Sequence, residues 1–343
     1  MNAKNMIFCV LILSTGISCN RSNQVIHRNI TGRAGELIVV MSKVAWDDKP
    51  GNIVRQFLSQ PQVSLPQEEP LFDITLIPHE AFKDIFLSTR NIIQTRISPI
   101  VENPGITFSN DVWAYPQATC QINARNNEEF VRIFTENNHK IIGYFLKAER
   151  DRLMANYNKL YEKAVYNTLE NNFDLNLRVS PGFVIKTPAD GFAWIRFETP
   201  EISQGVLVYS FPYRSDSAFT LNYLVAKRDS FLHLYVPGPA RGSFMTTEKM
   251  AKPVLNITKH NGNYAAEIRG LWKVENDFMG GPFIMLAELD AIRQRVVVID
   301  GYVYAPSKNK RNLLRQVEAM VYSLRLKDQD KNDKLNSEMN KRN

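Results

Sequence analysis

The residue with the most distinctive chemical setting in this sequence is Cys19. Lys4 stands in a short polar start, an apolar stretch covers residues 6–17, and Gly16-Ile17-Ser18 leads directly into the cysteine. A charged start, a short apolar stretch and a small-residue cleavage site make up a secretory signal. The stretch is too short to span a membrane, which takes about 20 apolar residues. We therefore predict that residues 1–18 are a lipoprotein signal peptide, and that the Cys19 thiol carries lipid, with palmitate among its acyl chains.

The cleavage site allows two interpretations. Bacterial lipoboxes commonly place Leu three residues before the cysteine, where this chain has Gly16, and Gly16 with Ser18 also fits an ordinary small-x-small site. In the interpretation we favour, a lipoprotein peptidase cuts before an acylated Cys19. In the other, a general signal peptidase releases a soluble protein with a free Cys19. The N-terminus resembles those of Gram-negative lipoproteins. In these proteins, an Asn after the lipidated cysteine with no acidic run behind it, as at Asn20 here, fits sorting to the periplasmic face of the outer membrane. We therefore expect a cell-envelope location.

Residues 268–283, IRGLWKVENDFMGGPF, are the least generic segment of the remaining chain. Trp beside Arg is a common recognition pair, and glycines let backbone approach a ligand closely. A tight connection between strands with a tryptophan in the core accounts for the same residues, so both interpretations stay open. The turn at 237–242 is either a rigid connection or part of a site. The candidate ligand-binding residues are Arg269, Trp272, Asp277, Gly280, Gly281 and Arg241.

No catalytic signature accompanies these candidates. The sequence has no GxSxG elbow, HExxH helix, P-loop or Rossmann glycine pattern, and its five histidines are far apart. Ser307 and Lys310 match S-x-x-K, but they stand at an expected helix start, where Ser acts as a cap. Glu288 and Asp290 share one side of an expected strand and are weak evidence for a hydrolase or a calcium site. We expect no metal and no cofactor, and we favour a protein that is not an enzyme.

Composition narrows the classes of partner. Removal of the signal takes Cys9, and Cys19 is the lipid site, so only Cys120 remains and no disulfide is expected; Cys120 is interpreted as a small buried apolar residue. The formal charge of +7 in an exported protein favours anionic lipid headgroups or acidic polymers over nucleic acid. We interpret the most basic stretch as the solvated face of the last helix, with a face turned to the membrane or to an acidic partner as the alternative. Its cations are Lys308, Lys310, Arg311, Arg315, Arg325 and Lys327.

Strands and helices alternate in the first half, after a polar tether over residues 19–32. We expect strands at 36–41, 71–77 and 92–97, helices after Pro50 and near 80–87, and one more strand over 111–124. A helix from Asn127 to Thr135 is followed by an interruption at Asn137-Asn138. A longer helix then runs from Lys140 to about Leu169, with its basic residues either solvated or docking a partner. This alternation indicates an α/β part over 33–172.

The second half reads as an antiparallel sheet. Short β-prone runs make up most of 173–306, and Asn261-Gly262 between two of them is the strongest hairpin signal in the chain. A second hairpin pairs 283–289 with 295–303, and a helix over 309–324 covers one face of the sheet. The predicted class is therefore α+β: an N-terminal α/β part with a long helical segment at 33–172, then a mostly antiparallel sheet capped by a C-terminal helix at 173–326. The tail over 327–343 is expected to be disordered.

Three segments carry a resemblance to a known family. They are GRAGELIVVMSKVAWDD at 32–48, LFDITLIPHEAF at 71–82 and GLWKVENDFMGGPF at 270–283. With them the chain resembles an uncharacterised family of Bacteroidetes lipoproteins, the DUF4837-like proteins, over nearly all of its mature length. The resemblance implies an envelope lipoprotein and supports lipidation, and it implies no activity and no site residues.

These observations support one leading hypothesis and two alternatives. The leading hypothesis is a non-catalytic binding or assembly module at the periplasmic face of the outer membrane, held by its lipid, with an envelope protein or polymer as partner and no nucleic acid. The first alternative is an envelope hydrolase with a site near Arg269, Trp272 and Asp277, which requires a polar pocket beside those residues. The second is a carrier of a small ligand or lipid, which requires an apolar cavity inside the sheet domain.

Overall fold

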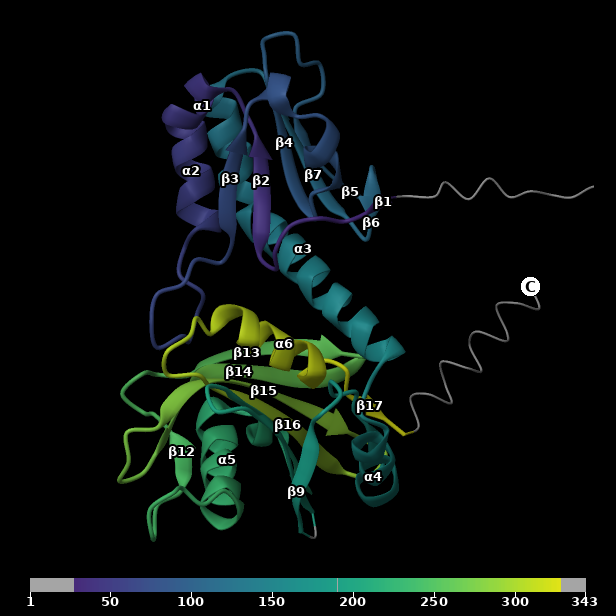
Figure 1. Cartoon of the computed structure of the whole chain (residues 1–343), viewed down its shortest axis with the longest axis vertical. Coiled ribbons are helices and arrows are strands. Elements are labelled where there is room, and N and C mark those ends of the chain that lie inside the picture. The colour runs from purple at the N-terminus through teal and green to yellow at the C-terminus, as the bar shows by residue number, and fades with distance from the viewer. Residues whose placement is uncertain (1–27, 190, 328–343) are drawn as a thin grey trace, which may run out of the picture.

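A long helix, α3 (Asn127–Lys159), connects two sheets in the computed structural model, which describes residues 28–189 and 191–327 (Figure 1). Asn126 caps the helix by accepting from the Glu129 backbone N–H at 2.8 Å. The predicted signal peptide over residues 1–18, Cys19 and the tail beyond residue 327 lie outside the described residues. Within the described ranges, no helix combines the length and apolar character needed to cross a membrane.

The N-terminal domain is built on a mixed five-stranded sheet in the order β3-β2-β4-β7-β5. Four strands are parallel and β5 runs antiparallel to β7. The run ELIVV in β2 is apolar throughout because both faces of a parallel sheet are covered. Helices α1, α2 and α3 cover one face, and two 3₁₀ turns cover the other. The elements are β1 (Arg28–Asn29), β2 (Glu36–Val40), α1 (Lys43–Asp47), α2 (Lys49–Leu58), β3 (Asp73–Ile77), η1 (His79–Ala81), η2 (Asp84–Ser88), β4 (Asn91–Ile97), β5 (Gly105–Asn110), β6 (Ala114–Tyr115) and β7 (Ala118–Ala124).

The C-terminal domain is an antiparallel sheet with helices on both faces (Figure 1). Its path is β12-β14-β15-β16-β11-β10-β9, and β13 pairs with β14. Helices α4 and α6 pack on one face and α5 on the other. The elements are α4 (Lys163–Phe173), β8 (Leu175–Asn176), β9 (Val184–Ala189), β10 (Phe192–Glu198), β11 (Ser203–Pro212), η3 (Asp216–Phe219), α5 (Leu221–Tyr235), β12 (Met245–Thr247), β13 (Val254–His260), β14 (Asn263–Val274), β15 (Gly280–Asp290), β16 (Arg295–Tyr304), α6 (Arg311–Val321) and β17 (Arg325–Leu326).

The α+β class and several elements agree with the sequence analysis. The hairpin at Asn261-Gly262 joins β13 to β14, and the second hairpin joins β15 to β16. Helix α6 packs on the sheet through Val317, Met320 and Val321, as its apolar spacing predicts. Cys120 is buried, and burial raises the pKa of its thiol to about 12, as expected of an inert core residue.

The helical segment differs from expectation at both of its predicted boundaries. Asn137 and Asn138 do not interrupt α3, because their side chains donate to the carbonyls of Ile133 and Thr135 within the helix. The helix also ends at Lys159 instead of continuing to Leu169. Residues 160–162 are extended, and α4 then turns back to pack on the C-terminal sheet, so tertiary packing overrides the continuous apolar spacing.

Two further local expectations were wrong. Residues 80–87 form two 3₁₀ turns instead of an α-helix, and Asp84, the first residue of the second turn, is in the left-handed region at φ +52°. Residues 111–124 do not form one strand: β6 ends before Pro116 and pairs with β1, and β7 begins at Ala118. The second half is mostly β between 173 and 306, as expected, and it also contains a helix that the sequence analysis did not identify, α5, which packs Leu224 and Leu232 onto the sheet.

Candidate functional site

Helix α6 packs on the C-terminal sheet, but its first turn is bonded to the N-terminal domain. The Glu69 carboxylate accepts from the backbone N–H groups of Lys310 at 2.6 Å and Arg311 at 3.0 Å. A carboxylate in this place satisfies amides that lack helical partners and interacts favourably with the helix dipole. Arg311 donates two hydrogen bonds to Asp73, at 3.1 and 2.6 Å. The loop over residues 59–72 and the start of β3 therefore hold α6 against the N-terminal domain (Figure 1).

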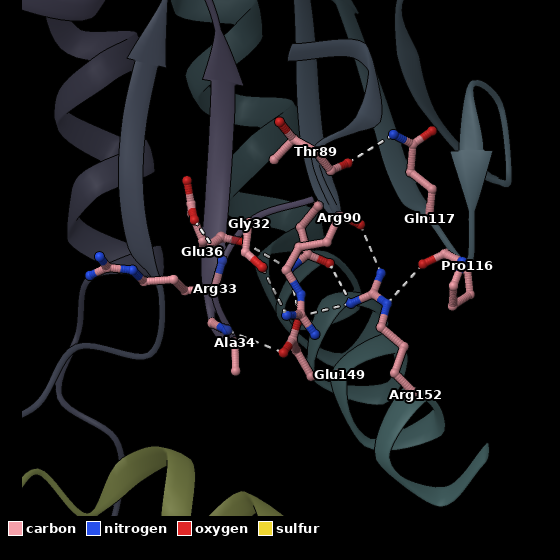
Figure 2. Close-up of polar contacts among 12 residues, drawn as sticks. Gly32, Arg33, Ala34, Glu36, Thr89, Arg90, Pro116, Gln117, Glu149 and Arg152 are labelled. Atoms are coloured by element: carbon pink, nitrogen blue, oxygen red, sulfur yellow. Dashed lines mark hydrogen bonds and ion pairs between the residues drawn. The ribbon is translucent and has the colours of Figure 1, made fainter. Parts of the chain in front are cut away.

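The Glu149 carboxylate on α3 ties the amino ends of neighbouring strands together (Figure 2). Only 3 % of Glu149 is exposed, and four donors surround its carboxylate. They are Arg90 Nε, Asn91 Nδ2 and Arg152 Nη1, each at 2.8 Å, and the Gly35 backbone N–H at 3.1 Å. Arg152 also donates from Nη2 to the Arg90 carbonyl at 2.7 Å. A buried carboxylate with this many donors is fully used as an acceptor.

A cleft of about 240 Å³ lies between the two domains beside this network. The loop over residues 59–72 and α3 supply the walls on the N-terminal side, and β14 and α6 supply those on the C-terminal side. One part of the lining is apolar and the other is densely charged. The lining residues are Gln62, Val63, Leu71, Leu146, Glu149, Arg150, Glu267, Arg269, Arg315 and Glu318.

Most charges in the cleft are paired, and the Arg150–Glu318 pair connects its two sides. Glu318 Oε1 on α6 lies 3.2 Å from Arg150 Nη1 on α3 and 3.1 Å from Arg269 Nη2 on β14. Glu267 accepts from Arg269 at 2.8 and 3.2 Å and from the Tyr322 hydroxyl at 2.5 Å. Burial alone raises the pKa of Glu267, but Arg269 and the hydrogen bond from Tyr322 outweigh it and hold that pKa below its ordinary value. Of these carboxylates, Glu318 joins the two domains through Arg150, and Glu267 is bonded within the C-terminal domain.

Arg315 differs from the other arginines that line the cleft. It is 6 % exposed, and its Nη2 donates to the Leu71 carbonyl at 2.6 Å. Its Nε and Nη1 have no hydrogen-bond partner, and within the described residues no carboxylate lies inside the 4.0 Å ion-pair distance. Burial, and after it the neighbouring Arg311, lower the pKa of Arg315 to about 10. The Arg315 side chain therefore lines the cavity, while two of its nitrogen atoms have no hydrogen-bond acceptor among the described residues.

Gly35 packs directly against this guanidinium, and a second cavity lies beside it. Gly35 has φ +83°, and a Cβ added there would lie 3.1 Å from Arg315 Nη1 and 2.8 Å from Arg311 Nη2. Glycine therefore meets both the left-handed conformation and the close approach. A second cavity of about 210 Å³ shares Glu149 and Arg315 with the cleft, so Arg315 borders empty space in both. Gln62 Oε1, also in the cleft lining, is a further buried atom without a partner.

The residues chosen from sequence do not gather in one place. Arg269 lines the cleft, on the face of β14 that meets α6. Trp272 lies on the opposite face, 2 % exposed in the core against α5, where its Nε1 donates to the Val303 carbonyl at 3.2 Å. The arrangement that the hydrolase hypothesis requires, one polar pocket beside Arg269, Trp272 and Asp277, is therefore not formed.

The remaining sequence candidates lie at the end of the β14–β15 hairpin and in the turn beside it. Asp277 accepts from the Met279 backbone N–H at 3.0 Å within the hairpin turn. Gly280 and Gly281 open β15, and a Cβ at Gly281 would lie 2.1 Å from the Val303 carbonyl oxygen. Close strand packing accounts for that glycine. Arg241 is exposed in the turn that precedes β12.

The two acidic residues considered for a hydrolase or a calcium site are paired in the structure. Glu288 Oε2 lies 2.7 Å from His260 Nδ1, and its Oε1 accepts from Asn263 at 2.6 Å. Asp290 accepts from Arg293 at 3.3 Å and from Arg295 at 2.9 Å. Over residues 28–189 and 191–327, no group of three or more His, Cys, Asp or Glu side chains is placed to hold a metal ion.

Sequence reasoning missed Arg315, Glu149 and Gln62. The interpretation of the basic last helix as a solvated face was wrong for Lys310, Arg311 and Arg315, which are 3 %, 5 % and 6 % exposed. The same correction applies to Arg152 on α3, which is 8 % exposed. A signal was present for Arg315: it stands between Leu314 and Val317 on a helix whose apolar face is buried. An arginine in that position either reaches solvent or enters an interface, and sequence alone does not distinguish the two.

Family models match two adjacent stretches of the chain. Residues 31–158 match DUF8532 and residues 162–323 match DUF4837, and both are described as domains of unknown function. The boundary between them falls where α3 ends. No curated protein matches the chain.

The structure is distantly similar to two solved proteins. One is the Saccharomyces cerevisiae Ran-binding protein Mog1p, with 11 % identity and a TM-score of 0.31, covering 46 % of this chain and 92 % of that one. The other is LpqN, described as involved in cell envelope biogenesis of Mycobacterium tuberculosis, with 11 % identity and a TM-score of 0.28, covering 44 % and 81 %. Both TM-scores are below 0.5, so we draw nothing about function from either protein.

Proposed function

We propose that this protein, which carries a DUF4837 domain behind a DUF8532 domain, is a lipid-anchored binding protein of the cell envelope that holds a small ligand in the cleft between its two domains. Its location in this proposal is the periplasmic face of the outer membrane, with the lipid on Cys19. The binding role is non-catalytic, and the ligand is a component of the envelope or is delivered by an envelope partner.

The observation that carries this proposal is the buried Arg315 in the wall of the cleft, whose Nε and Nη1 have no hydrogen-bond partner among the described residues. Protein interiors satisfy nearly all buried polar groups, because an unmade hydrogen bond costs about 1–3 kcal/mol, and more for a charged group. The cleft therefore combines unsatisfied hydrogen-bond donors with a cavity, and close packing of the two domains would have left neither. A site that is completed by a ligand accounts for this arrangement.

The pairing of the cleft carboxylates supports binding over hydrolysis. Glu149, Glu267 and Glu318 each accept hydrogen bonds from, or form ion pairs with, arginine side chains. A general base needs a pKa near the working pH, and the arginine beside Glu267 moves its pKa the other way. These groups are suited to fixing the domains and orienting a ligand.

The position of the cleft fits an anchor at Cys19. Gly32 to Gly35 run along the seam, where the Ala34 carbonyl accepts from Asn312 at 3.2 Å. Eight residues separate Cys19 from Arg28, and the nine residue-to-residue steps can reach at most roughly 30 Å when fully extended. A lipid on Cys19 would thus keep the cleft near the membrane surface, within reach of molecules that enter or leave it.

Anchoring is tested by fractionating cells that express the natural chain or Cys19→Ser. We expect the natural chain in the membrane fraction and the variant in the soluble fraction. A variant that stays in the membrane would contradict the lipid anchor.

Ligand occupancy is tested by native mass spectrometry of the full chain, purified from its own envelope in mild detergent. We compare Leu146→Trp, which fills the cleft, with Leu160→Trp, which makes the same change at a residue that is 67 % exposed. The natural chain and Leu160→Trp should carry the same bound small molecules, and Leu146→Trp should lose them. Equal occupancy in the folded Leu146→Trp variant would exclude the cleft as the site.

A further inference from the structure

We propose that the cleft binds a small amphipathic anion, with a carboxylate or phosphate group on Arg315 and an apolar chain along Val63, Leu71 and Leu146. This inference rests on the proposed function, since it names the class of ligand for the same cleft. It assigns Arg315 as the residue that selects the ligand's charge.

The charge balance around Arg315 supports an anion. A guanidinium has five N–H donors, and three of those on Arg315, one at Nε and two at Nη1, have no acceptor. Its neutral partner, the Leu71 carbonyl, does not compensate the charge. Burial of an unpaired charge is costly, whereas a hydrogen-bonded ion pair in the same place is tolerated. One anionic group completes the site.

The nearby carboxylates are committed to other cations. Glu149 accepts from Arg90 and Arg152, and both Asp73 oxygens accept from Arg311. None of these carboxylates lies at ion-pair distance from Arg315, so its Nε and Nη1 have no acceptor among the described residues. The adjacent Arg311 adds to the positive potential there, as its effect on the pKa of Arg315 indicates.

The apolar part of the lining indicates the rest of the ligand. Leu71 and Leu146 line the inner cleft, and Val63, which is 52 % exposed, gives a chain a way out to solvent. A volume of about 240 Å³ is below the usual range for drug-sized ligands, which is about 300–1,000 Å³. The site therefore suits a short chain with one charged end, and a longer chain would leave past Val63.

Four probes test the inference by calorimetric titration of the full chain: octanoate, octyl phosphate, the neutral octanol, and inorganic phosphate. Octanoate or octyl phosphate should bind, and the matched neutral probe should bind at least about tenfold more weakly, which is about 1.4 kcal/mol. Arg315→Gln should lose that preference for the anion, and Arg315→Lys, which keeps the charge, should retain part of it. Thermal unfolding of each variant verifies that it is folded.

The outcomes separate this inference from the proposed function. Octanol binding as tightly as octanoate, or a folded Arg315→Gln variant with unchanged affinity for both anions, would overturn the role of Arg315 and leave the cleft as a site for neutral ligands. Inorganic phosphate binding as tightly as octyl phosphate would overturn the apolar half of the inference. Anion binding that survives Leu146→Trp would instead contradict the cleft itself.

Discussion

Arg228 and Arg315 are both buried arginines, but their partners differ. Those of Arg228 fit a structural role, and those of Arg315 fit the ligand-binding role proposed above. Arg228 lies fully buried between α5 and the C-terminal sheet, where Nε donates to Asp300 at 2.8 Å and Nη1 to Thr247 at 2.9 Å. Its guanidinium carbon is 3.7 Å from the centre of the Phe283 ring. Arg315 has one carbonyl acceptor, and the ring of Phe72 is 5.3 Å away.

The two arginines differ in the source of the negative charge that balances them. In the C-terminal core the chain supplies the counter-charge to Arg228 from Asp300, although Arg228 Nη2 and Asp300 Oδ1 have no hydrogen-bond partner among the described residues. At the cleft, no carboxylate of the described residues lies within ion-pair distance of Arg315, and Glu149 and Glu318 interact with it only from farther away, while they are paired with other arginines. The difference predicts opposite responses to the same kind of substitution in the two regions.

The largest effect is expected in the core. Arg228→Met leaves Asp300 buried without its partner, which should lower the free energy of unfolding by about 3–5 kcal/mol. Arg228→Met combined with Asp300→Leu removes both charges and should be more stable than the single variant. Urea unfolding of the three proteins measures both numbers. A single variant as stable as the natural chain would show that the pair does not support the core.

A somewhat smaller loss is expected at the network on α3. Glu149→Gln removes the charge that Arg90 and Arg152 share, and should lower the free energy of unfolding by about 3 kcal/mol. The control is Asp151→Asn on the same helix, where the exposed pair with Lys147 should contribute only about 0–1 kcal/mol. If the two variants lose the same stability by chemical denaturation, the network is not a structural tie.

The cleft arginine should behave differently from both. Arg315→Met loses one hydrogen bond, to Leu71, but also removes an unpaired buried charge, so stability without ligand should stay within about 1 kcal/mol of the natural chain. The same variant should lose the gain in melting temperature that octanoate or octyl phosphate gives. Thermal unfolding with and without the probes measures both, and a loss as large as that of Glu149→Gln would mean that Arg315 is structural.

The smallest effect is a difference in pH dependence. The pKa of Glu267 is held below its ordinary 4.5, so this group adds stability above pH 4.5 that is lost as the pH falls through its folded-state pKa. For Asp300, burial outweighs Arg228 and raises the pKa above 3.8, so stability falls as the pH rises from 3.8 through the folded-state pKa. Unfolding between pH 3 and 7 should therefore give difference curves of opposite slope for Glu267→Gln and Asp300→Asn. Parallel slopes would contradict the assignment.

Much of the fold could be predicted from local patterns. Asn261-Gly262 specifies a tight hairpin, and the run at 36–40 specifies a buried strand, because each depends on a few neighbouring residues. The boundaries of α3 could not be predicted, since the turn after Lys159 depends on α4 packing against the distant C-terminal sheet. The helix α5 was hidden because its sequence is rich in residues that also favour strands.

The candidate site could not be predicted from local sequence patterns, for a related reason. Arg315, Glu149 and Gln62 are far apart in sequence, and each is an ordinary residue in its own segment. Their importance comes from the contact between two domains, which no spacing rule describes. Trp272 and the glycines at 280 and 281 were conspicuous in sequence because of tight packing in the C-terminal domain.

The most direct test of the central claim is a crystal structure of the full chain with 8-bromooctanoate, in which anomalous scattering locates the bromine. The account predicts the carboxylate within hydrogen-bond distance of Arg315 Nε or Nη1 and the bromine along Val63, Leu71 and Leu146. A carboxylate bound elsewhere, with the cleft empty and Arg315 unchanged, would contradict it.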